Sequence, residues 1–256
     1  MRIVRTIREA REALAPLGGS RVGLVPTMGA FHAGHVSLFR AARAETDVVV
    51  VSLFVNPTQF GDAADLARYP RSEDRDAAVA AEEGVDLLFA PDAGEMYPEG
   101  FQTWIDVVEL GSILEGAFRP GHFRGVATIC CKLFNIVRPD VAYFGQKDAQ
   151  QVEVVRRMVR DLDLELELRV LPTVRDADGL ALSSRNLRLS PAEREAALAL
   201  PRALATGDPD QARRLLDGLD VDYVEIAPFD PPTLAAAVRF GDTRLIDNIP
   251  LKGAHG

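Results

Sequence analysis

Two histidines lie three residues apart in the stretch Pro26-Thr27-Met28-Gly29-Ala30-Phe31-His32-Ala33-Gly34-His35. The apolar run 22–25 before it is typical of a short buried strand, and residues 36–44 after it carry apolar side chains at helical spacing. The histidines therefore fall where a predicted strand gives way to a predicted helix. Because backbone N–H groups are unpaired at such a point and the helix dipole is positive there, we expect this turn to bind phosphate. A purely structural pair of histidines is the alternative, since His-x-Gly-His alone is a weak motif.

The chain up to residue 171 alternates between strand-like and helix-like patterns. Residues 47–54 form a nearly continuous β-branched run, which is typical of a parallel strand covered on both faces. Further expected elements are a helix over 6–17, a helix over 73–83, a strand over 85–90, a helix over 126–137, a strand over 141–144, a helix over 148–161 and a strand over 164–171. This order predicts an α/β fold with an open parallel sheet of Rossmann type, whose ligands bind at the carboxyl ends of the strands.

A second, smaller α+β domain is expected at the C-terminal end. Ser190-Pro191-Ala192-Glu193 is a capping box with proline at the first helical position, and it predicts a helix to about residue 204. A helix over 210–219 and strands over 221–226 and 244–249 follow. We therefore expect two domains, 1–174 and 175–256. The polar loop 176–186 stands at this boundary, where closing elements often lie, so we expect it to be flexible and part of a lid.

Composition limits the function classes. The net charge of −9 argues against broad nucleic-acid binding, which depends on lysine and arginine. The sequence has neither an apolar leader nor a run near the roughly 18 apolar residues of a membrane span, so we expect a cytoplasmic protein with no membrane partner. Its two cysteines, Cys130 and Cys131, follow helical periodicity and are expected to be buried apolar residues rather than metal ligands.

Five segments together resemble the pantothenate synthetase family, the pantoate–β-alanine ligases of coenzyme A biosynthesis. Besides the histidine stretch, they are 54–61, 119–126, the segment 143–151 with Gly145-Gln146-Lys147-Asp148, and the segment 179–186 with Ser183-Ser184-Arg185. The histidine and Ser-Ser-Arg segments also resemble signatures of the wider nucleotidylyltransferase superfamily. The resemblance implies an AMP-forming ligase that condenses (R)-pantoate with β-alanine through a pantoyl-adenylate and releases AMP and pyrophosphate. It assigns ATP and pantoate to the first domain and a lid role to the second.

The resemblance also implies the site residues. His35, His32, Lys147 and Arg185 are the expected catalytic residues. We interpret His35 as a phosphate stabiliser, although the family assigns a proton donor there, because pyrophosphate held by magnesium hardly needs a proton. The implied ATP-binding residues are Met28, Gly29, Ala30, Phe31, His32, Ala33, Gly34, His35, Gly145, Gln146, Lys147, Asp148, Val174, Leu182, Ser183, Ser184 and Arg185.

Neutral amides are expected to hold the acid substrates, because they bind hydroxyl and carboxylate oxygens without adding charge. The resemblance assigns pantoate to Gln59 and Gln151, and β-alanine to Gln59. We add Asn56 as a second contact for β-alanine. From the residues alone, Asn56 before proline is also compatible with turn chemistry, and Gln151 with a solvated helix. We expect Mg²⁺ to bind mainly through the ATP phosphates, with no metal site formed by protein ligands alone. The resemblance further implies a homodimer.

Two departures from the family and three alternatives remain. Gln146 stands where the family often has glutamate, and the C-terminal domain is short near residues 205–208, which puts the lid geometry in doubt. Tyr69, Arg119, His122 and Arg124 lie in matching loops but could be ordinary surface residues. The alternative functions are a nucleotidylyltransferase, disfavoured by the two glutamines; a tRNA-binding synthetase fragment, disfavoured by the acidic charge; and an inactive nucleotide-binding module, disfavoured by the intact histidines, lysine and arginine.

Overall fold

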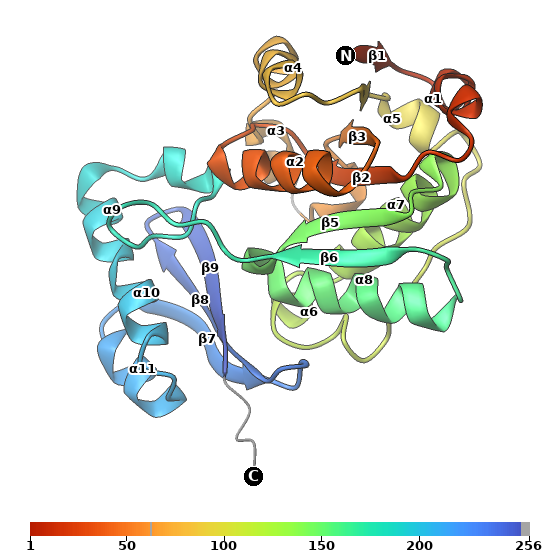
Figure 1. Ribbon diagram of the computed structural model, residues 1–256. Helices are drawn as coiled ribbons and strands as arrows, with labels where there is room; N and C mark the ends of the chain where they lie inside the picture. Colours follow the sequence, from red (N-terminus) through yellow and green to blue (C-terminus); the bar gives the residue numbers. More distant parts are fainter. Residues whose placement is uncertain (62, 252–256) are drawn as a thin grey trace. The chain divides into compact units, whose positions relative to one another are not determined.

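The computed structural model describes residues 1–61 and 63–251, and the chain divides into two compact units (Figure 1). Unit 1 comprises residues 1–145 and 151–171. Unit 2 comprises residues 146–150 and the chain from Pro172 onward. The division differs from the predicted boundary after residue 174, chiefly because the short segment around Lys147 groups with unit 2.

Unit 1 contains a six-stranded parallel sheet of order β1-β4-β3-β2-β5-β6. Its strands are β1 (Arg2–Val4), β2 (Val22–Thr27), β3 (Val48–Leu53), β4 (Leu87–Phe89), β5 (Val141–Gly145) and β6 (Glu167–Leu171). The helices are α1 (Ile7–Leu14), α2 (Ala33–Glu45), α3 (Ala63–Arg68), α4 (Glu73–Glu82), α5 (Ala93–Met96), α6 (Glu115–Phe118), α7 (His122–Val137) and α8 (Ala149–Asp161), with 3₁₀ turns η1 (Ala15–Leu17) and η2 (Pro57–Gln59).

Helices cover both faces of this sheet, as its alternating side chains require (Figure 1). Leu24, Val50 and Ala142 belong to a core with α1, α7 and α8. Their strand neighbours Val25 and Val51 belong to a second core with α2 and α4. Both faces are therefore apolar, which explains the continuous β-branched run of β3 and confirms the predicted Rossmann-type sheet.

The strand order reverses between β2 and β5, which are hydrogen-bonded neighbours. From β2 the chain continues to β3 and β4 on one side, whereas β5 is followed by β6 on the other. Ligands of open α/β sheets bind outside the carboxyl ends of the strands at such a switch point. The histidine stretch leaves the carboxyl end of β2 here, and residues 146–150 follow the end of β5.

Unit 2 is a small α+β unit, as predicted. Three helices pack on a three-stranded antiparallel sheet of order β7-β8-β9 (Figure 1). Its elements are η3 (Gln146–Asp148), η4 (Ser184–Arg188), α9 (Pro191–Ala197), α10 (Ala199–Leu204), α11 (Pro209–Leu215), β7 (Asp220–Ala227), β8 (Thr233–Phe240) and β9 (Thr243–Pro250). Leu204, Leu216 and Leu234 are completely buried in the core between helices and sheet.

Two elements of unit 2 differ from the sequence prediction. The helix expected over 190–204 is interrupted at Leu198, and Pro201, which lacks an N–H to bond within a helix, lies in the first turn of α10. Strand β8 was not predicted at all. It is the central strand and is buried on both faces except at Arg239, so its alanine-rich sequence lacks the alternation that marks a half-exposed strand.

Candidate active site

The two histidines form a cap at the start of α2. His32 is the N-cap residue, and its Nδ1 accepts from the backbone N–H of Gly34 at 3.1 Å. Reciprocally, His35 Nδ1 accepts from the N–H of His32 at 3.3 Å, and the ring centroids lie 4.3 Å apart. Because Nδ1 accepts in both rings, each neutral imidazole carries its proton on Nε2. Each ring is therefore set to donate from Nε2.

The turn before the histidines is held by a buried carboxylate. Asp76 of α4 is 1% exposed and accepts from the N–H groups of Ala30 and Phe31, both at 2.8 Å. Gly29 and Ala30 both have positive φ, 87° and 54°, and a Cβ on Gly29 would lie 2.8 Å from an Asp76 oxygen. Glycine at position 29 thus lets the turn approach the carboxylate closely.

These contacts correct the expectation of unpaired backbone N–H groups at this helix start. Asp76 and the two imidazole rings accept hydrogen bonds from the backbone N–H groups of residues 30, 31, 32 and 34. The N–H of His35 donates to the carbonyl of His32 at 2.8 Å. The Phe31 side chain lies in the core rather than in a pocket, with 3% exposure. The donors that this turn offers to a phosphate are therefore the imidazole Nε2–H groups more than the backbone.

After β3, an amide network orients Gln59. Asn56 is 1% exposed, and its Nδ2 donates to Gln59 Oε1 at 2.8 Å and to the carbonyl of Gly125 at 3.2 Å. Asn56 Oδ1 accepts from the hydroxyls of Thr58 at 2.9 Å and Tyr97 at 3.0 Å. Burial raises the pKa of Tyr97, so this hydroxyl keeps the proton that it donates. Because Gln59 Oε1 already accepts from Asn56, Nε2 is the group with which Gln59 can donate to a substrate oxygen.

The backbone of Gln59 is held from a second side. Its carbonyl accepts from His122 Nδ1 at 2.8 Å and from the Arg119 guanidinium at 3.2 Å. His122 Nε2 lies 3.2 Å from Arg119 Nη1, and since a guanidinium can only donate, Nε2 is the acceptor. Sequence reasoning left both residues aside as possible surface groups. The signal that could have identified them is their place in a segment that matches the family.

A cavity of about 360 Å³ opens beside the carboxyl ends of β2 and β3. Its volume lies in the range of small-molecule sites. Among the residues that line it are Met28, Phe54, Pro57, Arg71 and Asp76. The lining thus combines apolar side chains with one guanidinium and, counting Glu73, two carboxylates.

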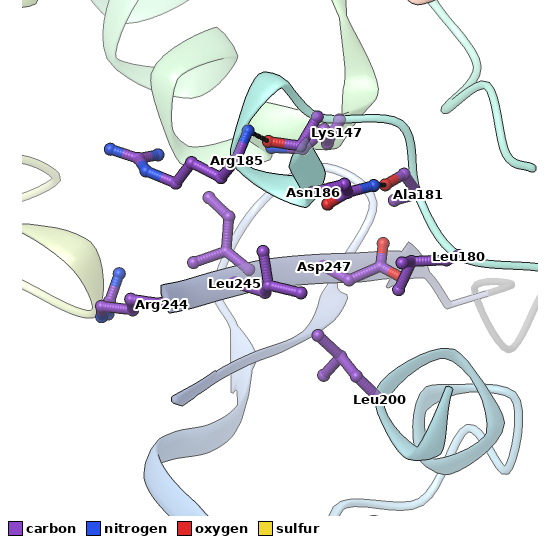
Figure 2. A pocket seen from close by; sticks show the side chains of 11 residues that line it. Lys147, Leu180, Ala181, Arg185, Asn186, Leu200, Arg244, Leu245 and Asp247 are labelled. Carbon is purple, nitrogen blue, oxygen red and sulfur yellow. Dashed lines mark hydrogen bonds between the residues drawn. The ribbon is translucent and has the colours of Figure 1, made fainter. Parts of the chain in front are cut away.

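Unit 2 has its own pocket, in which three of the predicted phosphate-binding residues meet (Figure 2). Lys147, Ser183 and Arg185 line it, and so do Arg244 and Asp247 of β9. Ser183 caps η4 by accepting from the N–H of Arg185 at 3.2 Å. The space that they enclose is only about 10 Å³, enough for about one water molecule, so the pocket gathers these side chains without itself accommodating a nucleotide.

The turn that leads to Ser183 is fixed by ion pairs. Arg194 of α9 pairs with both Asp176 and Asp178 at 2.7 Å, and these carboxylates raise the pKa of its guanidinium. Asp176 N also donates to the carbonyl of Leu180 at 2.8 Å, and Leu182 N to that of Val174 at 2.9 Å. The loop that was expected to be flexible is thus a hydrogen-bonded turn.

The other predicted site residues are divided between the two units. In unit 1, Gly145 ends β5 and Gln151 lies half-buried on α8. In unit 2, Asp148 pairs with Lys147 at 3.2 Å, and Gln146, Ser184 and Leu182 flank pocket-lining residues in sequence. The carbonyl of Val174 accepts from the N–H of Leu182 at 2.9 Å. The sequence analysis missed Asp76, Tyr97, Asp247 and Asn248, because they lie far along the chain from the motifs they support, and Arg175, whose partner Asp247 is 72 residues away. Within residues 1–61 and 63–251, no helix has the length and apolarity to cross a membrane.

Comparisons with known proteins agree over nearly the whole chain. A family model described as pantoate-beta-alanine ligase matches residues 2–250. The pantothenate synthetase of Roseiflexus castenholzii is 52% identical over 278 aligned positions, which cover 98% of this chain and 100% of the relative. That of Corynebacterium efficiens is also 52% identical, with 98% and 99% covered.

Solved structures give the same result. The crystal structure of pantothenate synthetase from Thermus thermophilus is similar with a TM-score of 0.92 and 47% identity, covering 98% of this chain and 99% of that one. Pantoate-beta-alanine ligase from Francisella tularensis, crystallised with beta-gamma ATP and beta-alanine, has a TM-score of 0.88 and 36% identity, with 98% and 97% covered.

Proposed function

Because the chain belongs to the pantoate–β-alanine ligase family, we propose that the residues described above carry out that family's reaction, the ATP-dependent condensation of (R)-pantoate with β-alanine. The observation that carries this assignment of roles is the histidine cap at the switch point of the sheet. Its two Nδ1 atoms are used by the backbone, which sets both Nε2–H groups as donors.

In the first step, a carboxylate oxygen of pantoate attacks the α-phosphorus of ATP. The bond from this phosphorus to the bridging oxygen of pyrophosphate breaks, and pantoyl-adenylate and pyrophosphate form. Negative charge spreads over the phosphoryl oxygens in the transition state, so positioned donors and cations are the main catalytic need. We assign this role to His32, His35, Lys147 and Arg185. Ser183 and Ser184 would add hydroxyl donors, and the family resemblance assigns residues 28–35, 145–148, 174 and 182 to ATP as well.

In the second step, the β-alanine amine attacks the carbonyl carbon of the adenylate. The bond from this carbon to the AMP oxygen breaks, AMP leaves, and the amine gives up a proton to form the amide of pantothenate. We assign pantoate to Gln59 and Gln151, and β-alanine to Gln59 with Asn56 beside it. The hydrogen bond from Asn56 to Gln59 supports this pairing, because it orients the Gln59 donor. The cavity beside Met28, which Val55 and Pro57 on either side of Asn56 help to line, has room for a small acid.

We further propose that Mg²⁺ enters with ATP and is held mainly by phosphate oxygens. Mg²⁺ usually keeps several waters and binds through substrate phosphates rather than in a cage of protein ligands. The ion would neutralise charge on the phosphates, while the residues above position them.

A homodimer in the cytoplasm completes the proposal. Support for the dimer is the family resemblance, and support for the compartment is that ATP and both acids are small metabolites found there. Light scattering on the purified protein tests the first point, with a monomer mass contradicting it. Cell fractionation tests the second.

The reaction is tested by omitting each substrate in turn. Pyrophosphate release must require pantoate, and AMP release must require β-alanine as well. With pantoate labelled by ¹⁸O in its carboxylate, one ¹⁸O atom must appear in AMP, because the acyl C–O bond breaks in the second step. A nucleotidylyltransferase would retain AMP in its product and release only pyrophosphate.

A further inference from the structure

The side chain of Asn248 in β9 holds the backbone of the segment that carries Lys147. Its Nδ2 donates to the carbonyl oxygens of Gln146 at 3.0 Å and Lys147 at 2.8 Å. Its Oδ1 accepts from Gln146 Nε2 at 3.2 Å. Asn248 is 4% exposed, so these three hydrogen bonds are shielded from water. They fix two consecutive carbonyl groups, and with them the Cα position from which the lysine side chain extends.

The preceding residue, Asp247, holds the other phosphate-binding segment. Its carboxylate accepts two hydrogen bonds from the Arg175 guanidinium, at 2.6 and 3.0 Å, and its side chain is 1% exposed. Arg175 donates in addition to the carbonyl of Gly179 at 3.2 Å and pairs with Ala181 in an isolated antiparallel bridge. Figure 2 shows Asp247 on β9, facing the segment that carries Ala181. This bidentate pair therefore anchors the turn that leads into Ser183.

Two adjacent residues of one strand thus hold both cationic segments of the pocket in unit 2. We propose that Asp247 and Asn248 are positioning residues that set the spacing between Lys147 and the Ser183–Arg185 segment for phosphate binding. The inference rests on the proposed function, because it takes Lys147 and Arg185 as the groups that meet the phosphates. Neither residue touches substrate in this scheme. They act through the two segments that they hold.

The physical reason for such a role is that lysine and arginine side chains are long and flexible. Their charged ends reach a fixed point only when the backbone beneath them is fixed. A misplacement of about 1 Å can slow a reaction by about 100-fold. Loss of the Asn248 amide would release two carbonyls directly under Lys147, so we expect the rate of adenylate formation to fall by about tenfold to 100-fold.

A double-mutant cycle tests whether Asn248 acts through Lys147. Single-turnover pyrophosphate release is measured for the wild type, Asn248→Ala, Lys147→Ala and the double variant. If the inference holds, Asn248→Ala slows the wild type strongly but changes the Lys147→Ala variant by less than about twofold, and it raises the KM for ATP more than the KM for pantoate. Additive losses in the two backgrounds, or equal changes in both KM values, overturn it.

Asn135→Ala is the matched control. This exposed asparagine of α7 also donates to a carbonyl, that of Cys131 at 3.0 Å, and its removal should leave both KM values unchanged. All variants are compared below their unfolding transitions. If Asn248→Ala does not fold, Asn248→Ser, which keeps a hydroxyl donor, takes its place in the cycle. A wild type without pantoate-dependent pyrophosphate release overturns the proposed function, whereas an active wild type with additive losses overturns this inference alone.

Discussion

The two ring nitrogens of His35 have different roles in this proposal: Nδ1 accepts in the helix cap, and Nε2 donates to the phosphate. The variant His35→Asn tests the two roles separately. The asparagine Oδ1 stands near the place of the histidine Nδ1 and can still accept from the N–H of His32, but nothing replaces Nε2. If Nε2 stabilises the transition state of adenylate formation, this variant loses about 10²–10³ in rate, the usual effect of removing one such donor. His35→Gln is the converse change, since its amide nitrogen stands near Nε2 while the cap is lost.

The expected effect on stability follows from the cap geometry. Loss of a helix cap costs about 0.5–2 kcal/mol. The hydrogen bond from His32 N to His35 Nδ1 is long, at 3.3 Å, so the lower end applies. We therefore expect His35→Ala to lower the free energy of unfolding by about 0.5 kcal/mol. It should also slow adenylate formation as His35→Asn does. His35→Asn should slow adenylate formation without lowering the free energy of unfolding. His35→Gln should lower the free energy of unfolding but keep part of the rate of adenylate formation.

Rapid-quench measurement of pyrophosphate, with ATP and pantoate but without β-alanine, reports the adenylation step alone. Urea denaturation gives the free energy of unfolding. Arg40→Ala is the control on the same helix, because its side chain is exposed and pairs with Glu83 away from the cap. The reasoning is refuted if His35→Asn forms adenylate at the wild-type rate, or if it is destabilised as much as His35→Ala.

Three further variants test the network around this cap. Asp76→Ala leaves two backbone N–H groups without their acceptor, at roughly 1–3 kcal/mol each, so urea denaturation should show a loss of about 2–6 kcal/mol in the free energy of unfolding. The control Asp74→Ala, at an exposed position of the same helix, should change this free energy little. Similar losses in the two variants would contradict the role given to Asp76. Gln59→Ala should raise the KM for pantoate about fivefold to 100-fold, as expected for one unmatched polar group, and equal changes for ATP would reassign it. Burial raises the pKa of Cys130 to about 12, so a Cys131→Ser variant should not react with Ellman's reagent at pH 8 until unfolded; rapid labelling of the native protein would show that the thiol is accessible.

Local patterns in the sequence predicted the local structure well. The capping boxes at Thr6 and Ser190 are both formed, with each cap side chain accepting from the residue three positions later. The apolar run of β3 is a strand because its neighbours cover both faces. Such features depend on residues within one turn or one strand of each other, so the sequence contains all that is needed to predict them.

Asp76 shows what local patterns could not predict. It lies in α4 close to Glu73 and Asp74, and nothing in its spacing separates a buried carboxylate from these exposed neighbours. Its partners Ala30 and Phe31 stand 46 and 45 residues away along the chain. Only the packing of α4 against the second face of the sheet brings them together. The resemblance assigned residues to the substrates, but it did not point to this group, which holds the histidine turn in place.

The same long-range effect changes the expected closing motion. Sequence reasoning treated residues 176–186 as a flexible lid and placed Lys147 in the first domain, whereas Asn248, 101 residues further on, holds the lysine segment in unit 2. The amides of Asp176, Gly179 and Leu182 are already hydrogen-bonded within the turn, at 2.8 to 2.9 Å. We therefore expect these amides to be protected from hydrogen exchange without ATP, and ATP with magnesium to add little protection. We then expect no separate opening and closing of residues 176–186. Exchange of these amides at the rate of an unstructured loop in the ligand-free enzyme, with protection only after ATP is added, would restore the local lid.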